Sequence, residues 1–193
     1  LSISEVSKSF GGVKVLENVA FNIREGARHA LIGPNGAGKT TLFNILSGIH
    51  EPDTGKVFFE GKDLSGIPSR KRIRLGISRS FQNIRLMPHL SVIENVMLGQ
   101  HSQYGLLDMI KPINLSSKYT GKGKAIKTLN NFGIDLHEGQ TVSSLPYGVR
   151  KKIEVVRALM ANPRLLLLDE PAAGLNATET ASLQEFLLEL SSK

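Results

Sequence analysis

The sequence contains no cysteine and no tryptophan, and it has no long hydrophobic run. Without cysteine there can be no disulfide framework, no thiolate-held zinc or iron–sulfur site and no cysteine nucleophile. The longest aliphatic run, Leu165–Leu168, is far too short to cross a bilayer, and no charged-then-apolar leader opens the chain. From these absences we expect a soluble, cytosolic domain.

The composition is that of an ordinary globular protein. The 193 residues are 40% hydrophobic and 21% charged, which is enough apolar material for one sizeable core. The length suits one domain, or one domain with a small inserted lobe. Lysine and arginine number 24 against 17 acidic residues, so the formal net charge is +7. That charge fits a polyanionic partner such as nucleic acid, phosphate or a membrane surface, and it equally fits a solvated basic surface.

A glycine-rich motif carries the clearest chemical signal. Residues 33–40 read Gly-Pro-Asn-Gly-Ala-Gly-Lys-Thr and fit the phosphate-loop pattern G-x-x-x-x-G-K-[ST]. An apolar strand is predicted before the motif, over 28–32, and a helix after it, over 39–49. Glycines let backbone N–H groups surround phosphate oxygens, and the helix N-terminus adds its positive dipole end. Lys39 is expected to reach the β- and γ-phosphates, and the Thr40 hydroxyl to ligate Mg²⁺.

A second motif is the aliphatic stretch Leu165–Leu168 followed by Asp169 and Glu170. A buried parallel strand releases its last residues at the carboxyl edge of the sheet, where α/β proteins bind ligands. Asp169 is expected to hold Mg²⁺ through water, and Glu170 to polarise the water that attacks the γ-phosphate. Alone, this pattern is as typical of a helix-capping turn as of a metal site. Paired with the phosphate loop, it predicts the acidic arm of a phosphoryl-transfer site.

The remaining elements follow from hydrophobic spacing. Short strands are predicted at 13–16, 19–23, 56–60 and 76–81, and helices at 68–75, 124–132 and 148–161. Ser91 and Glu94 form a predicted capping box that opens an amphipathic helix, and a polar stretch covers 114–124. A final helix has Leu183, Phe186, Leu187 and Leu190 at i, i+3, i+4, i+7 spacing. We interpret the middle of the chain as a helical lobe inserted into an α/β core.

Three further segments resemble the ATP-binding cassette (ABC) ATPases. Residues 145–150 (Leu-Pro-Tyr-Gly-Val-Arg) stand where that family carries its signature Leu-Ser-Gly-Gly-Gln. Residues 81–83 (Phe-Gln-Asn) are similar to the family's glutamine loop, and 171–176 (Pro-Ala-Ala-Gly-Leu-Asn) to the turn after its catalytic glutamate. Within the family, these segments look most like the ATPase subunits of branched-chain amino-acid importers.

The resemblance covers essentially the whole chain and implies an α/β fold. It implies a P-loop NTPase core with an antiparallel β subdomain, and an inserted α-helical subdomain at about 88–150 within a single 1–193 domain. The implied cofactors are ATP and Mg²⁺. The implied partners are a homologous ATPase subunit, transmembrane permease subunits and, indirectly, a solute-binding protein. The implied location is the cytoplasmic face of the cell membrane, as a peripheral protein, and no nucleic-acid partner is expected.

The family's site roles transfer by position. Glu170 and Gln82 are the expected catalytic residues, Gln82 by touching Mg²⁺ or the attacking water. The expected metal ligands are Thr40, Gln82 and Asp169. Phe10 is expected to stack on adenine, although a plain core or hairpin phenylalanine is the alternative. The nucleotide contacts are assigned to Phe10, Gly33, Pro34, Asn35, Gly36, Ala37, Gly38, Lys39, Thr40, Thr41, Tyr147 and Gly148.

Gly148 begins a helix whose N-terminus would face the γ-phosphate held by a second subunit, or it is an ordinary helix start. The five histidines (His29, His50, His89, His101 and His137) show no pair at metal-ligand spacing, so we expect surface or strand residues. The basic cluster Arg70, Lys71, Arg72 and Arg74 is expected to form a solvated helix face.

The chain also departs from the family pattern. Pro146 replaces the signature serine, Tyr147 its first glycine and Val149 its glutamine, which the importer subfamily tolerates. No histidine follows His137, where the family carries a switch histidine, and the strands that complete the sheet are missing. We therefore expect an incomplete domain that binds nucleotide weakly and hydrolyses it little above background.

The sequence thus predicts an ATP-binding and ATP-hydrolysing subunit of an ABC importer, for branched-chain or other hydrophobic amino acids. One alternative is a soluble ABC ATPase acting on nucleic acid or ribosomes. Such proteins carry long coiled coils, tandem cassettes or cysteine zinc modules, none of which the sequence contains. The other alternative is a regulatory module that binds ATP without turnover. The presence of Glu170 argues against it for the parent protein, whereas the alternative stays open for this fragment.

Overall fold

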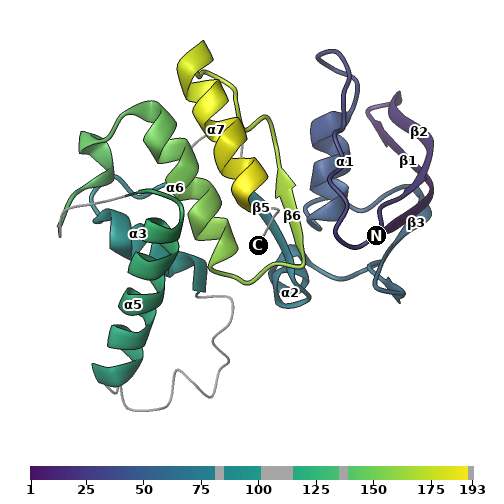
Figure 1. The fold of residues 1–193 in the computed structure, drawn as a ribbon. Coiled ribbons are helices and arrows are strands. Elements are labelled where there is room, and N and C mark those ends of the chain that lie inside the picture. The colour runs from purple at the N-terminus through teal and green to yellow at the C-terminus, as the bar shows by residue number, and fades with distance from the viewer. Residues whose placement is uncertain (81–84, 101–114, 135–138, 191–193) are drawn as a thin grey trace. The chain divides into compact units, whose positions relative to one another are not determined.

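The computed structural model describes residues 1–80, 85–100, 115–134 and 139–190. The chain divides into two compact units, Leu1–Leu75 and Gly76–Lys193. The first unit holds strands β1 (Ser2–Phe10), β2 (Val13–Asn22), β3 (Thr54–Phe59) and β4 (Lys62–Asp63) and helices α1 (Lys39–Leu46) and α2 (Ser69–Arg74) (Figure 1).

The first unit is built on an antiparallel sheet in the order β2-β1-β3-β4. Gly11 and Gly12 form the two-residue turn between β1 and β2, both at positive φ (54° and 83°), which glycine adopts without steric cost. α1 packs against β2 and closes an apolar core with the sheet. The buried members of this core are Ile3, Val6, Leu16, Leu42, Ile45, Leu46, Val57, Phe59 and Leu64. The predicted antiparallel subdomain is confirmed.

The predicted strands 13–16 and 19–23 are confirmed as strand structure but form one element, and the strand predicted at 28–32 was wrong. The segments 13–16 and 19–23 belong to one strand, β2, which runs through an irregularity at Asn18 (φ 46°). Asn18 tolerates this left-handed conformation, and its N–H donates to Ser7 Oγ at 3.0 Å, so the strand continues past it. Residues 28–32 lie outside every strand that the structure describes, and Ile32 is 90% exposed. Apolar composition alone does not make a strand, because the ladder needs a hydrogen-bonded neighbour.

The second unit combines a parallel strand pair with helices. It holds β5 (Ile77–Ser80), β6 (Leu165–Leu168), α3 (Val92–Leu98), α5 (Leu115–Asn131), the short 3₁₀ helix η2 (Val142–Ser144), α6 (Tyr147–Leu159) and α7 (Ala177–Leu190). The β5–β6 ladder runs in register from Ile77 opposite Leu165 to Ser80 opposite Leu168. Because the strands are parallel, both end at the same edge of the pair.

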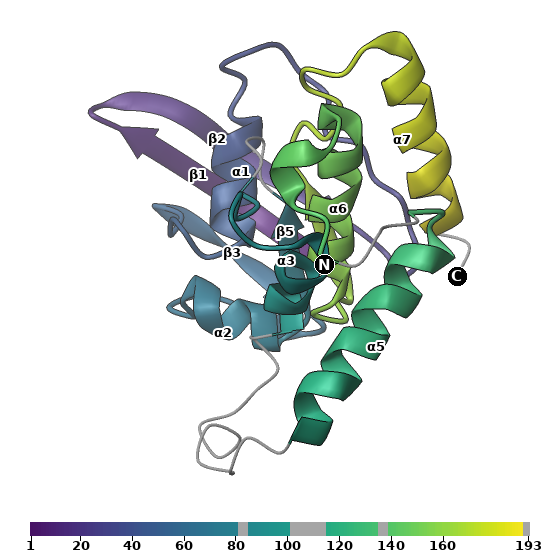
Figure 2. The same ribbon diagram turned by 90° about the vertical axis from the view of Figure 1, so that its left-hand side faces the viewer.

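Helices α3, α5 and α6 lie side by side in this unit (Figures 1 and 2). The predicted capping box is confirmed, because the N–H of Ser91 donates to Glu94 Oε2 at 2.8 Å and the N–H of Glu94 to Ser91 Oγ at 3.2 Å. The core of the unit gathers Val92, Val96, Leu129, Ile153, Val156, Leu183 and Phe186 among its buried members. The predicted apolar face of the last helix is confirmed at Leu183 and Phe186.

Helix α5 begins at Leu115, earlier than the predicted start at about residue 124, so it includes most of the polar stretch 114–124. Gly121 lies where α5 comes close to α3 and to the residue pair that follows it. A Cβ atom there would lie 3.0 Å from Gln100 Oε1 and 3.3 Å from Met97 Cε, so the missing side chain lets α5 approach α3 closely. None of the described helices is both long and apolar enough to cross a membrane.

Candidate functional site

The phosphate loop precedes α1 and is shaped by two glycines in the left-handed region. Gly36 has φ 84° and Gly38 has φ 81°. A Cβ atom at Gly38 would lie 2.7 Å from both Leu16 Cδ2 and the Val15 carbonyl oxygen, so the loop backbone rests directly on β2. At Gly36 the corresponding position is open space. Close packing on one side and an open backbone on the other are what a phosphate cradle requires.

The Lys39 side chain folds back onto the first residues of the loop. Its Nζ atom donates to the carbonyl oxygens of Gly33 at 2.7 Å and Pro34 at 2.8 Å. Within the described residues, no side chain caps the N-terminus of α1 and its first turn has no acidic residue. The helix N–H groups and the lysine therefore form a cationic end that fits a phosphate anion.

Each of the two units carries an oxygen donor of the kind that Mg²⁺ prefers. The described part of the chain has no group of three or more His, Cys, Asp or Glu residues able to hold a metal by itself. Mg²⁺ is usually bound by one or two carboxylates or hydroxyls plus substrate phosphates, so a complete protein cage is not needed. Thr40 is exposed in the first turn of α1, and Asp169 follows β6 directly. Both carry the hard oxygen donors that Mg²⁺ prefers.

Phe10 stands at the end of β1 and is 42% exposed. Its ring meets the edge of His50, with 5.3 Å between ring centroids, and Lys8 Nζ lies 5.5 Å from its centroid. The residue is therefore no core phenylalanine, but it does flank the hairpin turn between β1 and β2, opposite Val13. Adenine stacking stays a prediction beside the hairpin alternative. The other described histidine in a ring contact, His29, stacks on Phe21 with 5.8 Å between centroids.

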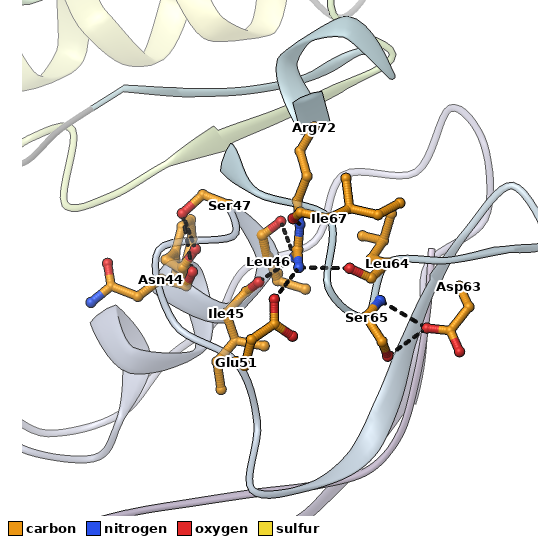
Figure 3. A network of polar contacts seen from close by, with 11 residues as sticks. Asn44, Ile45, Leu46, Ser47, Glu51, Asp63, Leu64, Ser65, Ile67 and Arg72 are labelled. Carbon is orange, nitrogen blue, oxygen red and sulfur yellow. Dashed lines mark hydrogen bonds and ion pairs between the residues drawn. The ribbon is translucent and has the colours of Figure 1, made fainter. Parts of the chain in front are cut away.

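The expectation of a solvated basic face was wrong for Arg72. Its side chain is 2% exposed and its guanidinium reaches into the turn that follows α1 (Figure 3). Nε donates to Ile67 O at 2.7 Å and Nη2 to Leu64 O at 2.8 Å. Nη1 donates to the carbonyl oxygens of Ile45 and Leu46 at the C-terminus of α1.

The Arg72 guanidinium thus satisfies carbonyl groups that the end of α1 leaves without helical partners. A cation at a helix C-terminus is also favoured by the helix dipole. Burial lowers the pKa of Arg72, and Glu51, 3.3 Å from Nη2, opposes that shift. Gly48 makes room for this arrangement, since a Cβ there would lie 2.7 Å from Arg72 Nε. Arg72 therefore anchors α1, the helix that follows the phosphate loop. The sequence did not predict its burial, because the six-residue helix α2 is too short to show a periodic pattern.

The acidic pair follows β6 as predicted. Asp169 is 4% exposed, and its Oδ2 accepts a hydrogen bond from Arg79 Nη2 at 2.7 Å. Glu170 has φ 45°, a left-handed conformation that non-glycine residues rarely adopt. Such strained backbone clusters at functional sites because the surrounding structure must enforce it. Gln82 lies outside the described residues.

The segment predicted to be the signature begins α6. Tyr147 is 37% exposed, whereas Gly148 is buried with its N–H donated to the Glu179 carboxylate. A Cβ atom at Gly174 would lie 3.3 Å from the Tyr147 ring, so the loop after Glu170 packs against the start of α6. The sequence missed Arg79 and Glu179 as neighbours of these motifs.

Comparisons with known proteins agree with this geometry. Residues 16–173 match the ABC transporter family. The high-affinity branched-chain amino acid transport ATP-binding protein LivG of Salmonella typhimurium is 37% identical, over 98% of this chain and 76% of LivG. The ribose import ATP-binding protein RbsA of Caldanaerobacter subterraneus subsp. tengcongensis is 36% identical, over 98% of this chain and 37% of RbsA.

A solved structure shows the same fold. The ADP conformation of MJ1267, an ATP-binding cassette of an ABC transporter, is 30% identical and superposes with a TM-score of 0.86. The match covers 99% of this chain and 76% of MJ1267. Sequence similarity and fold therefore agree over nearly the whole chain. The chain belongs to the ABC transporter family.

Proposed function

We propose that this chain binds Mg·ATP and hydrolyses it as the ATPase subunit of an importer for branched-chain or other hydrophobic amino acids. The observation that carries the proposal is the loop that ends at α1. Its backbone is open at Gly36 and packed tightly at Gly38, and Lys39 stands at the uncapped end of the helix. An anion bound there meets backbone N–H groups, a helix dipole and a lysine ammonium together.

In this proposal the residues divide the work. Lys39 and the loop N–H groups hold the β- and γ-phosphates, and Phe10 stacks on the adenine. When bound, Mg²⁺ neutralises phosphate charge, and Thr40, Gln82 and Asp169 are the residues that hold it. Glu170 orients the attacking water and accepts its proton. A second subunit supplies the N-terminus of its α6, so hydrolysis takes place between two copies or between two homologous chains.

The proposed partners are transmembrane permease subunits on the cytoplasmic face of the membrane, served by a solute-binding protein. Support for the amino-acid solute comes from the similarity to LivG, a branched-chain amino acid transport protein by name. RbsA, a ribose import protein by name, is 36% identical to this chain, but the alignment covers only 37% of RbsA. The alignment with LivG over 76% of its length therefore favours the amino-acid class.

The binding step is tested with Lys39→Ala and the matched control Lys62→Ala. Lys62 is an exposed lysine of the same unit, on β4. Calorimetry with Mg²⁺ and the non-hydrolysable analogue AMP-PNP is expected to show about a tenfold or greater loss of affinity in Lys39→Ala, because a charge-assisted contact is removed. Lys62→Ala is expected to bind like the parent. Equal affinities in all three proteins would contradict the phosphate assignment.

Residues 1–193 alone are expected to hydrolyse nucleotide little above background, so the catalytic step is tested on the chain extended to the length of its relative LivG, of which it matches 76%. Phosphate release is measured with the permease present in vesicles. Glu170→Gln keeps the size and hydrogen bonding of the side chain but cannot accept a proton. It is expected to bind AMP-PNP normally and to stop phosphate release, whereas Glu185→Gln on the exposed face of α7 retains it. Turnover in Glu170→Gln would exclude Glu170 as the base. A parent that binds but never hydrolyses would favour the regulatory module, and stimulation by nucleic acid in place of the permease would favour the soluble alternative.

A further inference from the structure

Arg79 and Asp169 are brought together by the register of the parallel strand pair. Arg79 lies opposite Leu167, and Asp169 follows two residues after Leu167. Residues two apart along a strand share a face, and diagonal neighbours across two strands are within reach of a long side chain. The Arg79 Nη2 atom accordingly donates to Asp169 Oδ2 at 2.7 Å. The two side chains are 7% and 5% exposed.

Stability alone is a weak reason for such a pair. Removing two charges from water costs several kcal/mol per ion, and their attraction roughly repays it only with good geometry. Well-packed apolar residues of similar volume often serve as well or better in the same place. The pair does have a geometric consequence, because the arginine fork is planar, always charged and rigid. It fixes the orientation of the one carboxylate that the proposed function assigns to magnesium.

We propose that Arg79 is a positioning residue for the magnesium ligand Asp169. The inference rests on the proposed function of Mg·ATP binding. Arg79 holds Oδ2, so Oδ1 is assigned to the metal or to a metal-bound water. Partners that orient a metal ligand in this way typically change metal affinity by 10- to 100-fold when removed. Arg79 also holds the buried carboxylate in place when no metal is bound.

The test measures how strongly magnesium assists nucleotide binding. The affinity for AMP-PNP is determined by calorimetry with Mg²⁺ and with EDTA, and the ratio of the two affinities is the readout. In Arg79→Met the ratio is expected to fall by roughly 10- to 100-fold, with little change in the EDTA affinity. Arg79→Lys keeps the charge without the planar fork and is expected to give an intermediate ratio.

Two controls separate positioning from general damage. Arg164→Met removes an exposed arginine immediately before β6 and is expected to keep the parental ratio. Asp169→Asn is expected to lower the ratio, and adding Arg79→Met to it should lower the ratio no further, because Arg79 acts through Asp169. A double variant with a clearly lower ratio than Asp169→Asn would overturn the inference.

Folding of each variant is checked by thermal unfolding. A parental ratio in a folded Arg79→Met protein would overturn the inference, and if that variant does not fold, a parental ratio in Arg79→Lys would do so. Failure of the proposed function looks different. In that case the parent itself shows no affinity for AMP-PNP, or an affinity that magnesium does not change.

Discussion

The backbone N–H of Gly148 donates to Oε1 of Glu179 across 3.2 Å. The second oxygen of the same carboxylate accepts the N–H of Asn176 at 3.1 Å, and the Asn176 side chain accepts the N–H of Glu179 at 2.9 Å. Glu179 therefore completes a capping box at the start of α7 and also satisfies an N–H at the start of α6. A Cβ atom at position 148 would lie 2.9 Å from Glu179 Oε1, so a larger residue there would require the carboxylate to shift.

Replacing Glu179 by alanine is expected to lower the free energy of unfolding by about 1–3 kcal/mol, because two backbone N–H groups lose their acceptor. Glu179→Gln keeps one acceptor oxygen and is expected to lose less. Glu185, an exposed residue of the same helix, is the matched control, and its alanine variant should unfold like the parent. Urea denaturation followed by circular dichroism measures all three. Equal midpoints for the Glu179 and Glu185 variants would contradict the bridging role.

Arg72→Met is expected to destabilise the first unit by about 3 kcal/mol or more, because the carbonyl groups at the end of α1 lose a charged donor. Arg74→Met is the control, since Arg74 is exposed on the same helix. Arg72→Met is also expected to weaken AMP-PNP binding, because the phosphate loop leads directly into α1. Denaturant unfolding and calorimetry provide the two readouts. Parental stability in Arg72→Met would mean that water replaces the guanidinium without cost.

The parts of the fold that the sequence predicted are those with local causes. The capping box of Ser91 and Glu94 depends on residues three apart, and the apolar face of α7 depends on helical spacing. The phosphate loop was also local, since its glycines and Lys39 all lie within residues 33–39. Each of these signals can be read without knowing which segment packs against which.

The parts that escaped prediction depend on distant segments. Arg72 sits in a basic run and is buried because the C-terminus of α1 and the loop after β4 offer it carbonyl oxygens. Arg79 finds Asp169 only through the register of β5 and β6, which no local pattern reveals. Residues 28–32 have the apolar composition of a strand, yet a strand exists only where a neighbouring strand completes its ladder.

Acid is expected to remove one stabilising contact of the first unit. Hydrogen bonds from the Ser65 hydroxyl and N–H, followed by Lys56, lower the pKa of Asp63 from 3.8 to about 2. A lowered pKa contributes stability that is present above the unfolded value and is lost as the pH falls through the folded value. The stability difference between the parent and Asp63→Asn should therefore be constant at neutral pH and shrink between pH 3.8 and about 2. Urea unfolding across this range measures it, and a difference that does not change with pH would contradict the assignment.

The two glycines of the phosphate loop give a matched pair that separates stability from binding. Both have positive φ, so alanine at either position meets the left-handed penalty of about 1–2 kcal/mol. Only Gly38 adds a collision, with Leu16 and Val15. Gly38→Ala is therefore expected to lose more stability than Gly36→Ala, by a further 1–3 kcal/mol or so of overpacking cost. Denaturant unfolding of the two variants tests this order.

For nucleotide binding, both glycine substitutions are expected to lower the affinity, but for different reasons. The methyl group of an alanine at position 36 enters the open side of the loop, where the proposed phosphate binds. Gly36→Ala is therefore expected to lose affinity for Mg·AMP-PNP by about tenfold or more, while most of its stability remains. Gly38→Ala is expected to lose affinity because the loop itself is displaced from β2. Calorimetry at a temperature where both variants are folded compares them. If Gly36→Ala keeps the parental affinity, the phosphate does not bind at the open face of Gly36. It would then be held only by the N-terminus of α1 and Lys39.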